Sequence, residues 1–466
     1  MKQFFRNSHS ALYYENPATI SIVVGFFFGV VEGILQLFEY GYKRVSMETD
    51  FLNPSSNLIQ TVERLQGCMI VLVVMMFILS ILLHFLLPTK IKIKRMVQRG
   101  LFYYPLGNPL NLKEGELLPR VKVKEIEKGK YEIKIRVTAF GLENLANVSS
   151  NISSSINNRN FDRYAVISTD SDIAMNWVKF VVEDVTIDRK LYVTSADKLK
   201  TGIATKLIVQ DNTYIDLTTS GSILVAGKTR SGKTTGIISL LLQALQYGRD
   251  NYGSEILIID PKRAELSRLP YTVTLDENGD GMAIIKALQK FENTIVSRQR
   301  VLNDISEQTG DAVKWWEAGM HVSFCFIDEY VAARSIFPTK AGKDNPEYTL
   351  GNFDGLVKRI VTMGASAGCY IIISIAEASV ESGGLPAMIR SAMSTRICFK
   401  PTMAEARLMW DSEKLKDLPE RIYKTGEAFF TSTNGVNENV TYVSFPYMDF
   451  KVYHELGRLL KSYYAD

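Results

Sequence analysis

The chain has 466 residues, of which 46% are hydrophobic, and 54 basic and 50 acidic side chains give it a formal net charge of +4. At roughly 150 residues per domain, this length predicts two to four folded units and excludes a single small module. Five of the basic residues lie within residues 89–100, which contain no acid. This local basicity argues against a protein that coats nucleic acid over its whole surface, and it favours a patch beside a membrane.

Two segments, 20–38 and 67–87, are apolar and close to the roughly 20 residues that cross a bilayer as a helix. The second ends at Pro88, directly before the basic cluster of residues 89–100. By the positive-inside rule this cluster faces the cytoplasm, and two crossings return the N-terminus to the same side. We therefore predict a multi-pass protein of the cell membrane, with residues 1–88 as its anchor and a cytoplasmic C-terminal part. Glycines 25, 29 and 33 share one helix face, which indicates either helix association or the general abundance of glycine in membrane helices.

The four cysteines are too few for a disulfide scaffold in a chain of this length. Cys68 lies in an apolar run, and Cys325, Cys369 and Cys398 lie in or beside strand-like segments. These positions predict buried free thiols in a reducing compartment. The four histidines have no ligand spacing with the cysteines, so we expect no structural zinc.

The segment from Val121 to Val137 alternates apolar and charged residues around Gly129, which predicts a half-buried hairpin. Apolar residues then recur at steps of three and four between Leu142 and Ile156, which is typical of a helix with one polar face. Strand-like runs follow at residues 177–185 and 190–194. Together these features predict a small α+β domain over residues 89–200.

Residues 227–234 fit the P-loop pattern, in which an apolar run precedes the loop and a helix-like stretch follows it. In such a loop the backbone amides curl around phosphate oxygens, the lysine neutralises the β- and γ-phosphates, and the last hydroxyl can bind Mg²⁺. The sequence therefore predicts a site for ATP and Mg²⁺. Its expected nucleotide-binding residues are Gly227, Lys228, Thr229, Arg230, Ser231, Gly232, Lys233, Thr234 and Thr235.

A second apolar run, residues 322–327, ends in Asp328 and Glu329, as a Walker B strand does. We expect Asp328 to hold Mg²⁺ through water and Glu329 to orient or deprotonate the attacking water. An acidic pair after a strand is also a common helix start. Its distance of about a hundred residues from the P-loop favours a Walker B strand instead. With the runs 223–226, 256–259 and 370–375, four buried parallel strands are visible, which indicates an α/β fold.

Four motifs now resemble one family. They are the P-loop, the run Asp260–Leu266, the Walker B segment Phe326–Tyr330 and the segment Gly364–Gly368. Together they resemble the FtsK/SpoIIIE DNA translocases, and in order and spacing they are most similar to the membrane-anchored coupling proteins of Gram-positive conjugative elements. The resemblance implies a RecA-like ATPase domain over residues 201–466 and a homo-hexamer that threads DNA toward a conjugation channel. It also implies a DNA-processing relaxase complex and the channel proteins as partners.

The resemblance is incomplete after the strand that ends at Ile375. The family commonly has Gln-Arg-Pro there, whereas this chain has Ala376, Glu377 and Ala378. Either Ser374 contacts the γ-phosphate instead, or hydrolysis is slower than in the relatives. In such hexamers a neighbour usually supplies an arginine, for which Arg396 is preferred over Arg390, although either could be an ordinary surface or salt-bridge residue. The expected catalytic residues are thus Lys233, Glu329 and Arg396.

Three functions stay open on the sequence. The leading one is an ATP-driven DNA-translocating coupling protein in the membrane, the second is a membrane ATPase that exports proteins, and the third is a nucleotide-gated docking receptor with little hydrolysis. DNA-contacting residues are poorly marked. Lys262 and Arg263 follow a strand and suit nucleotide or subunit sensing, whereas Arg298 and Arg300 are expected to be solvated and Trp315 and Trp316 to be packed. Whether the DNA is single- or double-stranded is left open.

Overall fold

The computed structural model describes residues 17–48, 56–102, 119–136, 152, 156, 164–171, 176–184, 186–340, 342–343, 345–376, 385–411, 415, 423–433 and 438–465. Its chain divides into two compact units, Met1–Thr186 and Ile187–Asp466, and each is described by itself. The helix expected between Leu142 and Ile156 lies outside the described residues, apart from Ile152 and Ile156, which are helical and buried.

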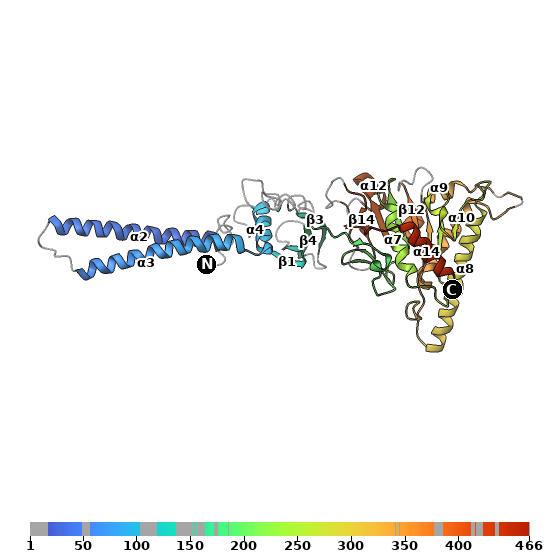
Figure 1. Cartoon of the computed structure of the whole chain (residues 1–466), viewed down its shortest axis with the longest axis horizontal. Helices are drawn as coiled ribbons and strands as arrows, with labels where there is room; N and C mark the ends of the chain where they lie inside the picture. Colours follow the sequence, from blue (N-terminus) through green and yellow to red (C-terminus); the bar gives the residue numbers. More distant parts are fainter. Residues whose placement is uncertain are drawn as a thin grey trace. The chain divides into compact units, whose positions relative to one another are not determined.

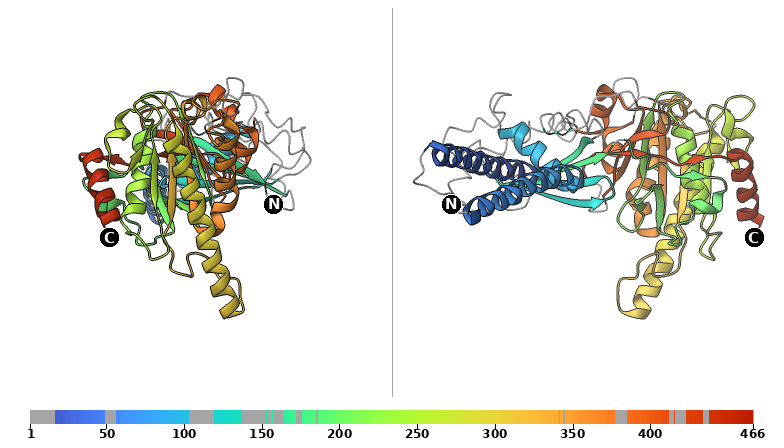
Figure 2. Two further views of the ribbon diagram at one scale, coloured as in Figure 1. Left: turned by 90° about the vertical axis from the view of Figure 1, so that its right-hand side faces the viewer. Right: turned by 60° about the vertical axis from the view of Figure 1, so that its left-hand side comes forward.

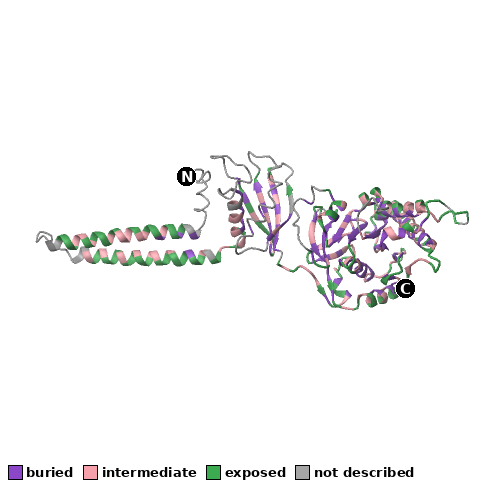
Figure 3. Ribbon diagram, turned by 90° about the horizontal axis from the view of Figure 1, so that it is seen from above, coloured by how far each residue is buried: buried purple, intermediate pink, exposed green. Residues whose placement is uncertain are grey.

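The first unit begins with two long helices, α2 (Pro17–Glu48) and α3 (Ser56–Leu86), drawn in blue in Figure 1. Within them the segments Ile20–Val45 and Ile59–Leu83 have mean hydropathies of 2.1 and 2.6, and only 11% and 6% of their residues are buried. Exposed and half-exposed residues follow both helices in Figure 3. An apolar helix surface this open suits lipid, so the two predicted segments are candidate membrane spans, longer than the sequence indicated.

Gly25 marks the contact between these two helices. A Cβ atom at Gly25 would lie 3.2 Å from Cβ of Met76 in α3, whereas Gly29 and Gly33 face open space. The glycine therefore permits a close approach of α2 and α3 at one point only, and not along the whole predicted face.

The rest of the first unit is a four-stranded antiparallel sheet of order β1-β2-β4-β3 with a helix packed on it. Its elements are α4 (Thr89–Phe102), β1 (Val121–Glu127), β2 (Lys130–Arg136), β3 (Tyr164–Ser171) and β4 (Trp177–Asp184). Gly129 forms the β1–β2 turn with φ 74°, so the predicted hairpin is present. In α4 the apolar residues at four-residue spacing, Ile93, Val97 and Leu101, are buried against the sheet. The helix thus belongs to the core of this small domain.

The second unit is built on an eight-stranded sheet of order β10-β9-β11-β12-β8-β13-β14-β15. The six strands from β10 to β13 in this order are parallel, and β14 and β15 are antiparallel. The strands are β8 (Ile223–Gly227), β9 (Ile256–Ile259), β10 (Thr272–Val273), β11 (Ser323–Ile327), β12 (Cys369–Ile375), β13 (Thr395–Phe399), β14 (Glu427–Thr431) and β15 (Thr441–Ser444). The four strands expected from the sequence are β8, β9, β11 and β12, and the prediction of an α/β P-loop NTPase fold is confirmed.

Helices cover both faces of this sheet, as the views in Figure 2 show. They are α7 (Lys233–Leu245), α8 (Met282–Thr309), α9 (Tyr330–Ser335), α10 (Leu350–Met363), α11 (Ala387–Ala392), α12 (Met403–Met409) and α14 (Val452–Ala465), with 3₁₀ turns at Ala196–Leu199, Glu265–Arg268 and Gly364–Ala367. In β8, Ile223 and Val225 pack in the core with α7 and α14, while Leu224 and Ala226 pack in the core with α10. Alternate residues of one strand therefore serve two cores, which explains why the parallel strands read as continuous apolar runs.

Two small pairs of strands complete the second unit. The strands β6 (Lys206–Gln210) and β7 (Thr213–Asp216) form a hairpin, and β5 (Tyr192–Val193) pairs with β16 (Tyr447–Met448). The strand expected over residues 190–194 is thus only two residues long. Ala196 and Leu199, which follow it, are buried in the core beneath α7.

Two expectations about buried residues are wrong, those for Arg298 and Cys68. Arg298 was expected to be solvated, but its side chain is fully buried, and it forms an ion pair with Asp250. The expectation that both tryptophans are packed is confirmed, because Trp315 is buried and Trp316 packs beside it with ring centroids 5.5 Å apart. The cysteines are free, and all are buried except Cys68, which is exposed on α3.

Candidate nucleotide site

The loop between β8 and α7 has a backbone that only glycine can follow at two positions. Gly227 has φ 151°, and a Cβ atom there would lie 2.8 Å from Oγ of Ser231. Gly232 has φ 97°, and its Cβ atom would lie 2.8 Å from the main-chain nitrogen of Gly426. These glycines let the chain turn from strand to helix while the amides stay exposed to a ligand. The strand, loop and helix expected of a P-loop are therefore present.

A turn before β14 supports this loop from outside. The main-chain N–H of Gly426 donates to the carbonyl of Ser231 at 3.0 Å, and the Thr425 hydroxyl donates to the carbonyl of Arg230 at 3.4 Å. Lys228, at the exposed end of the loop, forms a 3.5 Å ion pair with Glu405. Sequence spacing did not predict these contacts because the supporting residues lie about two hundred positions away. The Thr402-x-x-Glu405 capping box was a local sign only of the helix that carries Glu405.

The donors at the loop fit a polyphosphate. The Ser231 side chain is buried, and its Oγ atom has no hydrogen-bond partner among the residues that the structure describes. Lys233 and Thr234 open α7, so an ammonium and a hydroxyl lie at a helix N-terminus. Thr235 is exposed in the same turn. An orphaned hydroxyl, a cation and a helix dipole in one place match the chemistry of nucleotide phosphates.

The Walker B glutamate lies against the P-loop lysine. Oε2 of Glu329 is 3.6 Å from Nζ of Lys233 and 3.5 Å from Nζ of Lys262. Its other oxygen, Oε1, accepts a 3.0 Å hydrogen bond from the main-chain N–H of Ala376. Glu329 also has φ 57°, a conformation that non-glycine residues adopt rarely and that often marks a functional position. The structure thus brings together the end of β11, the end of β12 and the P-loop, and it adds Lys262 from the loop after β9.

Asp328 and Lys233 share a buried environment that disfavours both charges. Burial raises the pKa of the Asp328 carboxyl, Lys233 opposes this, and nearby Asp260 raises it further. Burial likewise lowers the pKa of Lys233, while Glu329 and Asp328 oppose that shift. Asp260 itself is fully buried and accepts main-chain N–H bonds from Lys262 and Ser267. A divalent cation would relieve the crowding of carboxylates here.

The residues present fit Mg²⁺ only together with phosphate and water. Within the described ranges no group of three or more His, Cys, Asp or Glu could hold a metal ion. Mg²⁺ commonly keeps several waters and takes one or two protein ligands beside substrate phosphates. Thr234 and Asp328 supply that number of ligands. The Ser374 hydroxyl lowers the pKa of Asp328, although its Oγ atom forms no well-aligned hydrogen bond with any described residue. Its expected contact with a γ-phosphate stays a prediction.

The two candidate arginines lie apart from this cluster. Arg396 in β13 donates to the carbonyls of Met393, Met409 and Arg390, and Arg390 donates to the carbonyl of Leu408 at 2.8 Å. Burial lowers the pKa of Arg396, and Arg390 lowers it further. Within its own chain the Arg396 side chain therefore links three main-chain carbonyl groups. Its action on a neighbouring subunit's nucleotide stays a prediction.

Gly236 gives a stability prediction for the helix that carries Lys233. A Cβ atom at this position would collide with the ring of buried Phe399, so Gly236→Ala overpacks the contact and displaces the start of α7. We expect a loss of about 1–3 kcal/mol in unfolding free energy, together with weaker ATP binding. Gly351→Ala in α10 is the matched control, because open space surrounds Gly351 and alanine favours helix there. Chemical denaturation and ATP titration of both variants check this, and equal stability of the two would contradict it.

Comparison with known proteins relates part of the chain to one family. Residues 186–320 match the model of the FtsK/SpoIIIE family. This match covers less than a third of the chain. The chain is 24% identical over 257 residues to the DNA translocase FtsK of Helicobacter pylori strain J99, a match that covers 54% of this chain and 28% of that protein. It is 25% identical over 284 residues to the DNA translocase FtsK of Agrobacterium fabrum, with 51% and 30% covered. The chain therefore spans less than a third of the length of these relatives.

Two solved structures are similar to the chain at low identity. The conjugation coupling protein TcpA of pCW3, in its monomer form with ATPγS, is 17% identical and has a TM-score of 0.46, with 79% of this chain and 99% of that chain covered. The ATPases 2 and 3 of EssC from Geobacillus thermodenitrificans are 14% identical with a TM-score of 0.43, covering 59% and 52%. At these scores the likeness carries no inference about activity. The predicted resemblance to the FtsK/SpoIIIE family is confirmed over residues 186–320, and that family consists of P-loop ATPases, which supports nucleotide binding at this site.

Proposed function

We propose that the chain is a membrane-anchored, ATP-driven DNA translocase that acts as a coupling protein and delivers DNA to a conjugative transfer channel. The observation that carries the proposal is the meeting of Lys233 and Glu329 at the P-loop of an FtsK/SpoIIIE domain. Two candidate spans precede that domain, which supports anchoring in the cell membrane with the N-terminus and the ATPase domain in the cytoplasm. The proposed organisation is an anchor over residues 1–88, a small domain over 89–200 and an ATPase domain over 201–466.

The site residues divide the chemistry of ATP hydrolysis among them. Mg²⁺, when bound, would neutralise charge on the phosphates of the substrate ATP, and Thr234 and Asp328 would hold the ion. Lys233 turns from Glu329 to the β- and γ-phosphates. Glu329, relieved of one of its two lysines, takes a proton from the attacking water, and the Ala376 N–H holds its other oxygen in place. The water oxygen bonds to the γ-phosphorus while the bond from that phosphorus to the β–γ bridging oxygen breaks, which yields ADP and inorganic phosphate.

Assembly and partners follow from the same proposal. A homo-hexamer would bring Arg396, or Arg390, of one subunit to the nucleotide of the next, where an arginine stabilises transition-state charge. DNA is the proposed cargo, and the relaxase complex and the channel proteins are the proposed partners.

A nucleotide-gated docking receptor with little hydrolysis is the second candidate. The specific observation in its favour is Ala376, which offers Glu329 only a main-chain N–H where the family commonly places a polar side chain. Glu329 is also held by both Lys233 and Lys262. These contacts occupy the carboxylate, which favours a state with little hydrolysis.

ATP turnover by the full chain in neutral-lipid nanodiscs separates the two candidates. We expect turnover that rises several-fold with single- or double-stranded DNA and falls to background in Lys233→Ala, because that variant loses the cation that binds the phosphates. The strand form that stimulates more identifies the cargo. ATP binding without hydrolysis under every DNA condition would contradict the motor and favour the receptor.

A further inference from the structure

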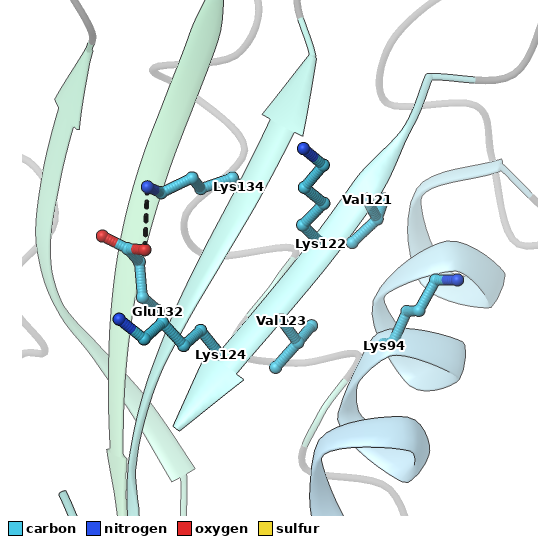
Figure 4. A pocket seen from close by; sticks show the side chains of 7 residues that line it. All are labelled: Lys94, Val121, Lys122, Val123, Lys124, Glu132 and Lys134. Carbon is cyan, nitrogen blue, oxygen red and sulfur yellow. Dashed lines mark ion pairs between the residues drawn. The ribbon is translucent and has the colours of Figure 1, made fainter. Parts of the chain in front are cut away.

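The small domain of the first unit has a basic groove that no part of the ATPase function uses. Its volume is about 480 Å³, and its lysines are Lys94 from α4 and Lys122, Lys124 and Lys134 from the β1–β2 hairpin. Figure 4 shows Lys122, Lys124, Lys134 and Glu132 on the hairpin and Lys94 on the neighbouring helix, where its amine points away from them. Four lysines and one glutamate give the groove a net charge of +3. We call this site the basic groove.

Strand register explains why these lysines gather. Lys122 pairs with Lys134 and Lys124 with Glu132 across β1 and β2, so alternate residues of both strands point to one face. Lys134 forms a 3.0 Å ion pair with Glu132. Lys122 is positioned by Trp177, with Nζ 4.7 Å from the ring centroid.

The groove is short of negative charge. In the described part of the chain no carboxylate pairs with Lys94, Lys122 or Lys124. Like charges held this close repel one another unless an anion lies between them. Val121 and Val123 line the groove from the opposite face of β1, and Val121 is buried in the core of the small domain. The lysine side chains therefore fit an anion.

The covalent chain places this groove close to the end of a candidate membrane span. Helix α3 ends at Leu86, and α4 begins at once, since the N–H groups of Ile91 and Lys92 both donate to the carbonyl of Pro88. Lys94 is six residues beyond Pro88, a helical rise of about 9 Å. The headgroup layer is roughly 5–8 Å thick on each side of the hydrocarbon core. The groove thus lies within reach of lipid phosphates and within about one Debye length of them.

The apolar face of α4 cannot serve as the membrane contact. Ile93, Val97 and Leu101 are buried in the core of the small domain, so the helix does not lie in the interface by that face. The part of the small domain that can contact the membrane is therefore the basic groove beside this helix. A binding mode through phosphate, without helix insertion, follows from this arrangement.

We propose that the basic groove binds the headgroup of an anionic phospholipid of the membrane that α3 crosses. Lys122 and Lys124 contact the phosphodiester, and Lys94 adds positive charge at the edge of the groove. A nucleic-acid backbone has the same phosphodiester, but the link to α3 favours lipid. The inference does not depend on ATP hydrolysis or DNA transport.

Native mass spectrometry of the full chain in detergent tests this with dioleoyl phosphatidylglycerol and dioleoyl phosphatidylcholine as probes. We expect wild-type protein to retain phosphatidylglycerol preferentially and to lose the preference as salt rises. The variant Lys122→Gln with Lys124→Gln should reduce retained phosphatidylglycerol about fivefold or more, since each lysine near an anionic surface contributes roughly fivefold. ATP binding should not change.

Lys128→Gln with Lys130→Gln is the matched control, because both lysines lie at the turn of the same hairpin, outside the groove, and the loss of charge is equal. Equal lipid loss in both variants would mean diffuse charge attraction and would overturn the proposal, as would a wild-type protein with no lipid preference. Labelled single- and double-stranded oligonucleotides, titrated against the same variants in phosphatidylcholine nanodiscs, form the second arm. Loss of oligonucleotide binding with unchanged lipid retention would assign the groove to nucleic acid instead.

Discussion

Glu329→Gln should lower ATP turnover at least a hundredfold while ATP still binds. A positioned general base contributes about 10²–10⁴-fold to a rate, and the amide has no basic oxygen with which to take a proton from water. The amide oxygen of glutamine can still accept the hydrogen bond that the Ala376 N–H now donates to Glu329. The side chain therefore keeps its place and loses only its charge.

The same substitution should tighten nucleotide binding, or at least not weaken it. In the structure Glu329 and the nucleotide phosphates compete for Lys233, whose Nζ lies 3.6 Å from the carboxylate. Removing the carboxylate charge removes the competitor, and it also frees Lys262. Titration with a fluorescent ATP analogue measures binding, and a coupled assay measures turnover.

Glu265→Gln is the control for this variant. Glu265 follows the same loop as Lys262, but its carboxylate accepts a hydrogen bond from Tyr453 at 2.6 Å and no lysine of the site pairs with it. We expect its turnover to stay within about twofold of wild type, as for a surface carboxylate. If Glu329→Gln kept a tenth or more of wild-type turnover, the assignment of Glu329 as general base would be wrong.

The parts of the site that the sequence predicted are local in the chain. The P-loop needs glycines at fixed positions because its own backbone turns there, and Gly227 and Gly232 both have positive φ. Asp328 and Glu329 were marked by the apolar strand before them. Such signals extend over ten residues or fewer, so they can be read without a fold.

The parts that were missed depend on segments far apart in the chain. The support from Gly426 to Ser231 joins positions 195 residues apart, and the main-chain N–H of Ala376 reaches Glu329 only because β11 and β12 are neighbours. The basic groove was invisible for the same reason, since the lysines of β1 and β2 meet through strand register and Lys94 joins them from a helix. Sequence spacing predicted strands and loops, but the contacts between them depend on strand order.

Arg298 shows this limit most clearly, and it carries the largest stability prediction. Its helix has polar residues on both sides, which favoured a solvated arginine, yet the guanidinium donates to the Ser323 hydroxyl at 2.9 Å, to the His321 carbonyl at 2.7 Å and to Asp250 at 3.2 Å. Arg298→Met leaves the buried Asp250 carboxylate without its cation. Breaking a buried pair in this way costs about 3–5 kcal/mol, so we expect the melting temperature of the second unit to fall by roughly 10 °C.

Two further variants separate a buried ion pair from a simple loss of packing. Arg300→Met, on the exposed side of the same helix, should change stability by less than about 0.5 kcal/mol. Adding Asp250→Asn to Arg298→Met removes the orphaned charge and should recover at least about 1 kcal/mol, because the asparagine can still accept hydrogen bonds from the N–H groups of Tyr252 and Ser254. No recovery would mean that the arginine acts by filling space. ATP affinity below the transition should stay unchanged throughout, since Ser323 begins β11 whereas the nucleotide site lies beyond the other end of the parallel strands.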